Sequence, residues 1–244
     1  WTFKLRGNLK WSDGVPLKAS DFVYGFRYLL NPKTAARYAS IEYVIKNAEA
    51  VNTGKMPLDQ LGVRAPDDRT VEITLEGPAP FLPGLMKHYT AFPVPEHVHR
   101  KYGEAWARPG NMVSNGPYKL TEWEPHDHVK LVKNPLFYDA QNVRIDEVYF
   151  YPVENESTAL TMFRAGNIDA NITTRGIPIA QLPWLRENMP GQAHTPPILA
   201  NSYMALNARR PPFDDKRVRR AVSLCIDREI LAEKVVKDGR VPAY

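Results

Sequence analysis

The sequence predicts a mixed α/β fold, because segments with strand periodicity alternate with segments of helical periodicity. Residues 2–5 alternate polar and apolar side chains, residues 12–14 have turn chemistry, and residues 22–30 carry apolar side chains at helical spacing. Residues 145–153 again alternate as in a strand, and a helix preceded by a polar capping run follows at 159–165. At 244 residues, the chain can form one large domain or two ordinary ones.

The first 95 residues read as a small α/β unit. After the opening strand, turn and helix, a second helical stretch is expected at residues 39–50. A strand follows at 71–75, and a short helix is expected at 81–88. Prolines then punctuate the chain up to residue 96, so the unit should end there.

The middle of the chain predicts a hairpin and a crossover. Residues 118–124 should pair with residues 129–133 across a polar turn. After the strand at 145–153, the helix at 159–165 should end at a glycine and return as a strand at 168–170. This strand, helix, strand order favours parallel neighbours.

The last part of the chain is expected to be mainly helical. A helix is predicted at residues 178–187, and Asp214 is the predicted N-cap of the next one. Asp227 should begin a further helix. Cys225 falls on the apolar side of its helix, so we expect a small buried side chain rather than a nucleophile.

Composition excludes several classes of function. The net charge is +5, but Lys and Arg are spread along the chain and interleaved with acids, unlike a nucleic-acid footprint. No apolar run reaches the ~18 residues of a membrane span. The single cysteine excludes an internal disulfide, and no G-x-S-x-G or phosphate-binding glycine motif occurs.

Two His-x-His pairs, His97 with His99 and His126 with His128, are the candidate metal ligands. On an extended strand, each pair would place both imidazoles on one side, where they could hold zinc or nickel. Two ligands do not make a site, since zinc needs three or four, and no H-E-x-x-H is present. We therefore predict no metal and no cofactor, with a zinc-dependent hydrolase as an alternative.

Several strings occur in an order that resembles one protein family. They are Trp11-Ser-Asp-Gly-Val-Pro16, Asn31-Pro-Lys-Thr-Ala-Ala-Arg-Tyr-Ala-Ser40, Asn115-Gly-Pro-Tyr118, Phe163-Arg-Ala-Gly-Asn-Ile-Asp169 and Pro212-Phe-Asp-Asp-Lys-Arg-Val-Arg-Arg-Ala-Val222. The chain resembles the extracytoplasmic solute-binding proteins of peptide ABC importers, the oligopeptide- and dipeptide-binding family 5. The resemblance covers essentially the whole chain and is greatest to the oligopeptide-binding members.

The resemblance implies a periplasmic-binding-protein-like two-lobe fold of type II, incomplete at both ends. Residues 1–95 would be the small α/β subdomain of lobe one, and residues 96–198 its main part. Residues 199–244 would be the crossover and the first elements of lobe two. Family members continue on both sides of such a stretch, so the chain is expected to be a fragment that binds peptide weakly alone.

The resemblance also implies a function. The protein would be a receptor that captures oligopeptides and delivers them to an ABC importer, without being an enzyme. Its partners would be the peptide ligand and the permease subunits, with no nucleic acid, and it would act as a monomer. It would lie in the periplasm, with a lipid anchor left open.

The resemblance implies ligand contacts in three places. Tyr38 lies in a loop whose tyrosine approaches the peptide in the family. Asn171, Ile172, Thr173 and Thr174 follow the 163–169 motif, where family members hydrogen-bond the peptide backbone. The remaining candidates are Asn201 and Tyr203 on the crossover strand. The chain departs from the family at 172–174, where an aromatic residue and paired asparagines are usual, so its ligand preference could differ.

The sequence is also compatible with other functions. The same fold could bind a dipeptide, a murein peptide, glutathione, haem or a nickel complex. A zinc-dependent hydrolase would use the His-x-His pairs. A ligand-sensing domain fused to a DNA-binding module would also use this fold.

Overall fold

The computed structural model describes residues 1–172, 177–194, 200–237 and 239–243. The contacts divide the chain into two compact units, residues 1–152 and 153–244, which are described separately. This division does not test the boundaries expected after residues 95 and 198, which stay predictions.

The first unit contains an antiparallel sheet with the strand order β1-β3-β2. Its strands are β1 (Thr2–Lys4), β2 (Val63–Asp67) and β3 (Thr70–Ile73). Phe3 lies opposite Val71, and the register shifts within β2. The sequence analysis missed β2, because this edge strand contains a proline and only its first residue is buried.

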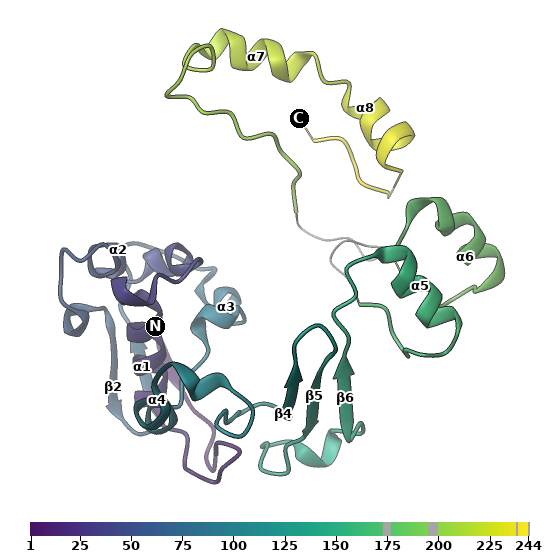
Figure 1. Cartoon of the computed structure of the whole chain (residues 1–244). Helices are drawn as coiled ribbons and strands as arrows, with labels where there is room; N and C mark the ends of the chain where they lie inside the picture. The colour runs from purple at the N-terminus through teal and green to yellow at the C-terminus, as the bar shows by residue number, and fades with distance from the viewer. Residues whose placement is uncertain (173–176, 195–199, 238, 244) are drawn as a thin grey trace. The chain divides into compact units, whose positions relative to one another are not determined.

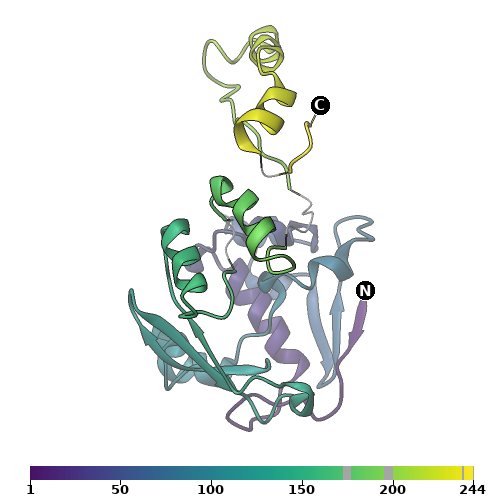
Figure 2. The ribbon, with the colours of Figure 1, turned by 90° about the vertical axis from the view of Figure 1, so that its right-hand side faces the viewer.

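Helix α1 (Ala19–Leu30) packs against this sheet (Figures 1 and 2). Val23, Phe26 and Leu30 recur at helical spacing and are buried at the contact, as the sequence predicts. The helix ends before Asn31 because Pro32 disfavours helical backbone at the residue that precedes it. The opening strand, turn and helix are therefore confirmed.

Short helices follow α1 in the first unit and alternate with the strands of this sheet along the chain. They are η1 (Pro32–Thr34), η2 (Ala39–Val44), α2 (Ala48–Asn52), η3 (Leu58–Gln60), α3 (Leu82–Leu85), η4 (Tyr89–Ala91), α4 (Glu96–Tyr102) and η5 (Gly103–Ala107). The predicted helix at 39–50 is divided in two, because Asn47 has a left-handed backbone with φ of 65°. Ile45 and Leu82 are fully buried in the core that these segments enclose.

A second antiparallel sheet completes the first unit (Figure 1). It orders its strands β4 (Tyr118–Glu124), β5 (His128–Lys133) and β6 (Glu147–Phe150), with η6 (Ala140–Asn142) between the last two. The hairpin of β4 and β5 is the one that the sequence predicts. β6 pairs with β5 and confirms the strand expected within 145–153.

The second unit is helical in its described residues. Its helices are α5 (Glu156–Arg164), η7 (Ile179–Gln181), α6 (Leu182–Asn188), α7 (Lys216–Leu224), α8 (Arg228–Ile230) and the π-helix η8 (Leu231–Val236). Asn155 caps α5 and Asp227 caps α8, as predicted, since each carboxamide or carboxylate oxygen accepts a backbone N–H of the first turn.

Three predictions for the second unit are wrong. Residues 168–170 form no strand, because no described segment pairs with their backbone groups. The N-cap of α7 is Asp215 rather than Asp214, since it is the Asp215 carboxylate that accepts the Arg217 N–H. Cys225 is exposed, because no residue of α7 is buried and its apolar side therefore has no cover within the described residues.

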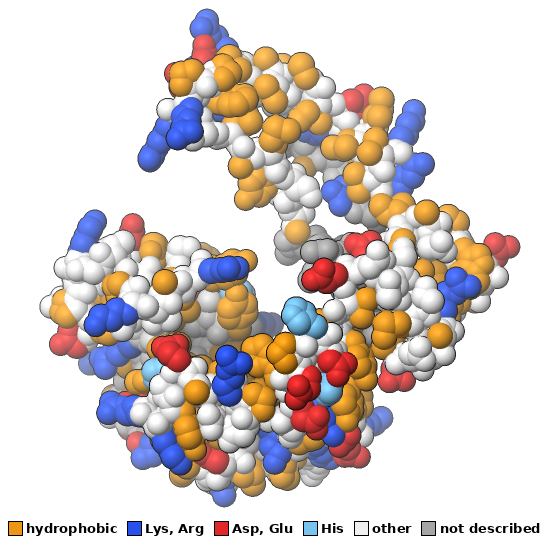
Figure 3. All heavy atoms as spheres, viewed as in Figure 1, with side chains coloured by type: hydrophobic (Ala, Val, Ile, Leu, Met, Phe, Trp, Pro, Cys, Tyr) orange, Lys and Arg blue, Asp and Glu red, His pale blue; other side chains and the backbone are white. Residues whose placement is uncertain are grey.

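The surface is mixed in charge. Figure 3 shows Lys and Arg side chains dispersed over the face in view, with Asp and Glu side chains among them. Among the described residues, no helix combines the length and the apolarity that crossing a membrane requires.

Candidate ligand-binding surface

Tyr38 lies in a small group of rings on the surface of the first unit. The Tyr38 ring is 5.9 Å from the His88 ring and 6.1 Å from the Tyr89 ring, with edge-to-face geometry in both pairs. The centroids of the His88 and Tyr89 rings are 4.2 Å apart, and both residues lie at the start of η4. We call Tyr38, His88 and Tyr89 the aromatic cluster. Because Tyr38 and Tyr89 are 53% and 58% exposed, their rings remain available to a ligand.

A chain of hydrogen bonds connects the aromatic cluster to the protein interior. Nδ1 of His88 lies 2.9 Å from the Thr90 hydroxyl, and that hydroxyl lies 2.6 Å from Oε1 of Glu42. Thr90 and Glu42 are buried, and Glu42 has no exposed surface. These hydrogen bonds fix the orientation of the His88 ring within the aromatic cluster.

Burial raises the pKa of the Glu42 carboxyl above its ordinary value of 4.5. The hydrogen bond from Thr90 and the nearby His88 act in the opposite direction. Oε2 of Glu42 is buried without a hydrogen-bond partner in the described residues. Since an ionised oxygen without partners is costly in the interior, this environment favours the neutral carboxyl.

The Trp11 motif forms a scaffold on the same unit. The buried Trp11 ring donates from Nε1 to Oδ2 of Asp21 over 3.2 Å, and the Lys18 N–H donates to the same oxygen over 2.9 Å. Burial raises the pKa of Asp21, while these two bonds oppose the shift. Gly14 has φ of 92°, a conformation that favours glycine, and closes the turn onto the Trp11 carbonyl. The motif thus fixes the entry into α1.

The same motif is bonded to Ser114, which directly precedes the 115–118 motif. Ser12 and Ser114 exchange two hydrogen bonds, and the buried Asn134 donates to the Gly116 carbonyl over 2.9 Å. Two strings that the sequence places about a hundred residues apart therefore form one rigid connection within the first unit.

The other predicted contact residues belong to the second unit. Ile172 and Tyr203 are 89% and 85% exposed, and Asn201 is also exposed. Nδ2 of Asn171 is buried without a partner in the described part of the chain. Thr173 and Thr174 lie outside the described residues. The roles of these residues stay predictions.

The histidine pairs do not have the geometry expected of metal ligands. His97 and His99 lie on helix α4 rather than on a strand, so their rings point in different directions. Nε2 of His97 bonds Asp13 over 2.7 Å, and Nδ1 of His99 bonds the Tyr24 hydroxyl over 2.6 Å. In the described residues, no three metal-binding side chains come together.

The second pair lies at the β4–β5 hairpin. His126 occupies the turn with φ of 65°, and His128 begins β5 between two carboxylates. The hydrogen bonds to Asp127 and then Glu122, at 3.0 and 3.3 Å, raise the pKa of His128. The imidazole of His128 and the two carboxylates attract one another on the surface of the hairpin, which is an ordinary structural role.

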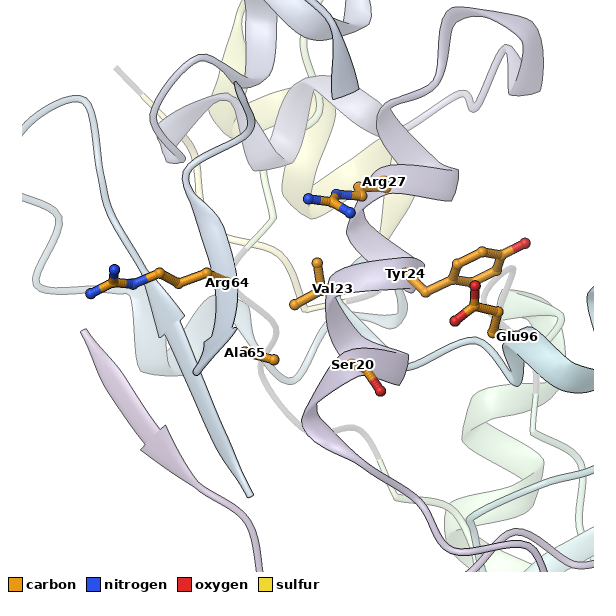
Figure 4. Close-up of a pocket in the computed structure, with 7 residues that line it drawn as sticks. All are labelled: Ser20, Val23, Tyr24, Arg27, Arg64, Ala65 and Glu96. Atoms are coloured by element: carbon orange, nitrogen blue, oxygen red, sulfur yellow. The ribbon is translucent and has the colours of Figure 1, made fainter. Parts of the chain in front are cut away.

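A shallow pocket of about 300 Å³ lies beside α1 (Figure 4). Its lining includes Arg27 and Tyr24 of α1, Arg64 of β2 and Glu96 of α4, and the Arg64 guanidinium points away from α1. Arg64 forms an ion pair with Glu72, and Glu96 forms one with Arg100. Much of the charge in the lining of the pocket is therefore already neutralised. None of the residues predicted to contact a ligand lines this pocket, and we assign no ligand to it.

Sequence reasoning missed His88, Tyr89, Thr90 and Glu42. The signal available was the density of aromatic residues between residues 81 and 92, of which Phe81, Tyr89 and Phe92 are all more than half exposed. An exposed aromatic group of this kind is typical of a binding surface.

The whole chain, residues 1–244, matches the family described as bacterial extracellular solute-binding proteins, family 5 Middle. The chain belongs to this family, as its motifs indicate. The family is one of solute-binding proteins rather than of enzymes.

Named relatives are similar over the full chain. The periplasmic oligopeptide-binding protein OppA of Salmonella typhimurium is 40% identical over 100% of this chain and 45% of that protein. The probable deoxycholate-binding periplasmic protein YgiS of Escherichia coli is 40% identical over 97% of this chain and 44% of that protein. The chain thus spans about 45% of the length of these relatives.

Solved structures confirm the fold class. The chain matches Burkholderia pseudomallei OppA with a TM-score of 0.88 and 40% identity, covering 99% of this chain and 47% of that one. It matches the E. coli murein tripeptide binding protein MppA with a TM-score of 0.90 and 39% identity, covering 100% and 47%. The predicted mixed α/β class, as part of a type II periplasmic-binding-protein fold, is therefore correct.

Proposed function

We propose that the chain is the part of an oligopeptide receptor that carries the aromatic cluster, and that the receptor delivers peptides to an ABC importer. The observation that carries this proposal is the exposed Tyr38 ring, which stands in the family's 31–40 string beside His88 and Tyr89. The relatives add support, since OppA and MppA are described as binding oligopeptides and a murein tripeptide.

The chemistry of the cluster suits a peptide. Each tyrosine offers a ring face for stacking and a hydroxyl that can donate or accept. His88 adds a ring nitrogen with hydrogen-bonding capacity. Backbone groups are common to all peptides, so a surface that satisfies them binds many sequences with modest selectivity.

The proposal includes binding and release without chemical change of the ligand, and no cofactor. Asn171 to Thr174, Asn201 and Tyr203 would contribute further contacts to the peptide backbone. The two lobes would close over the ligand through a shift between open and closed states, and the closed form would engage the permease subunits. The receptor would act outside the cytoplasm as a monomer.

A bile acid is the second candidate, because the relative described as a probable deoxycholate-binding protein is 40% identical to the chain. A rigid steroid with a carboxylate could also lie against exposed aromatic rings. A peptide has backbone groups that the receptor must hydrogen-bond, and a bile acid has none. Titration of the protein with each ligand therefore separates the two candidates.

The test is calorimetry on the natural protein, meaning the chain with whatever flanking sequence its gene encodes. We expect micromolar or tighter binding of a tripeptide to pentapeptide pool and no saturable binding of deoxycholate. Saturable binding of deoxycholate alone would replace the proposed ligand, and binding of neither would contradict the proposal.

A further inference from the structure

Nδ1 of His88 is approached by two donors of one residue. The Thr90 hydroxyl lies 2.9 Å from this nitrogen, and the Thr90 backbone N–H points to it over 3.4 Å. A backbone N–H can only donate, so it interacts favourably with a ring nitrogen that carries a lone pair. If Nδ1 carried a proton, two N–H groups would face one another.

The Thr90 hydroxyl has one proton and two neighbours, and two arrangements make both contacts hydrogen bonds with no carboxyl proton left unpaired on Oε2. In the first, Glu42 is ionised, Thr90 donates to Oε1 of Glu42, and Nδ1–H of His88 must donate to Thr90. In the second, Glu42 is neutral and donates its carboxyl proton to Thr90, which then donates to a bare Nδ1. The distances of 2.6 and 2.9 Å suit either direction.

The surroundings of Glu42 select the second arrangement. Glu42 is fully buried, and its Oε2 has no partner in the described residues. An ionised carboxylate would leave a charged oxygen unpaired, whereas the neutral form leaves only a carbonyl oxygen there. The neighbours that act on the Glu42 carboxyl are the Thr90 hydroxyl and the titratable side chain of His88.

We propose that Glu42 and Thr90 are positioning residues that hold His88 in the Nε2–H tautomer, so that the aromatic cluster presents a hydrogen-bond donor. The ligand group that this donor recognises is an acceptor, such as a peptide carbonyl or carboxylate. The identity of that ligand rests on the proposed function, but the tautomer does not.

The test of the tautomer is ¹⁵N NMR of the histidine side chains of the 244-residue chain at neutral pH without ligand. The His88→Gln variant identifies the His88 signals. We expect a protonated Nε2 and a bare Nδ1 in the wild type. Protonation of Nδ1, with or without Nε2, would overturn the proposal.

Three variants separate positioning from simple packing. Glu42→Gln should keep the tautomer, because the neutral amide can donate to Thr90, and a switch to Nδ1–H would contradict a neutral Glu42. Thr90→Val should weaken the bias between the tautomers, because only the backbone N–H of residue 90 still faces Nδ1, whereas Thr90→Ser, which keeps the hydroxyl, should retain the full bias. A tautomer that is unchanged in a folded Thr90→Val variant would also overturn the proposal.

Peptide calorimetry on the natural protein is the second readout. Thr90→Val should weaken binding about fivefold through loss of one oriented hydrogen bond, while Thr90→Ser should bind as the wild type does. Equal binding by Thr90→Val would show that the donor does not reach the ligand. If the wild type binds no peptide, the proposed function fails and the NMR result alone decides the tautomer.

Discussion

Ser12 and Ser114 form a reciprocal pair of hydrogen bonds across a separation of 102 residues. The Ser12 N–H donates to the Ser114 carbonyl over 2.8 Å, and the Ser114 N–H donates to the Ser12 hydroxyl oxygen over 3.0 Å. Ser114 also accepts the Gly116 N–H on its own hydroxyl. The Trp11 motif is thereby fixed to the segment that leads into the 115–118 motif.

The Ser12→Ala variant should lower the free energy of unfolding by about 1 kcal/mol, since it leaves the half-buried Ser114 N–H without its acceptor. Urea unfolding measures the loss. Ser40→Ala is the matched control, because the Ser40 side chain is exposed. Equal stability of the two variants would show that the bond contributes nothing.

Gly25 on α1 and Gly84 on α3 should respond to alanine in opposite ways. A Cβ at Gly25 would lie 2.7 Å from the Phe92 carbonyl oxygen, so Gly25→Ala should cost about 1–3 kcal/mol of stability. A Cβ at Gly84 meets nothing within 4 Å, so Gly84→Ala should stabilise by up to about 1 kcal/mol through helix propensity. Thermal unfolding of both variants checks the contrast, and a shift of the same sign would refute it.

Glu42 should give the unfolding free energy a specific pH dependence. Because burial raises its pKa in the folded state, the folded chain binds more protons than the unfolded chain between pH 4.5 and that raised value. The contribution of Glu42 to the free energy of unfolding is therefore fully present below pH 4.5. It is lost as the pH rises from 4.5 through the raised pKa of the folded state. His88, the titratable group beside Glu42, is unchanged in the Glu42→Gln variant.

Glu42→Gln should remove this loss, so that the stability of the variant relative to the wild type increases from pH 4.5 towards neutrality. Urea unfolding at several pH values measures the difference. Glu49→Gln, in an exposed position, controls for the loss of a negative charge. Parallel pH profiles for Glu42→Gln and the wild type would contradict the raised pKa.

Tyr38→Ala should weaken peptide binding by the natural protein about tenfold, because a stacking surface is lost at the cluster. Tyr138→Ala is the control, since Tyr138 is 57% exposed against 53% for Tyr38 but packs against Arg6 instead. Calorimetry with one defined tripeptide compares the two. The same loss of affinity in both variants would remove Tyr38 from the site.

The sequence predicts those features whose causes are local. The turn at Gly14, the hairpin at β4 and β5, and the caps Asn155 and Asp227 each depend on a few neighbouring residues. The return strand at 168–170 was wrong because a strand depends on a partner elsewhere in the chain. Periodicity alone does not supply that partner.

The candidate site was predicted only in part, for a similar reason. Tyr38 was found through its motif, but Glu42 and Thr90 are 48 residues apart and meet only in the folded chain. A glutamate between Ile41 and Tyr43 has no feature in the sequence that marks it as fully buried. Charged residues are rarely buried, so composition argues against the arrangement that the structure has.

The central claim is that the natural protein is a peptide receptor. Native mass spectrometry of that protein, purified from its host without unfolding, tests this most directly because a receptor of this kind retains its ligand. We predict a mass above that of the polypeptide, which dissociates to a mixture of short peptides. Release of deoxycholate or another non-peptide cargo, with no peptide at any stage, would contradict the claim.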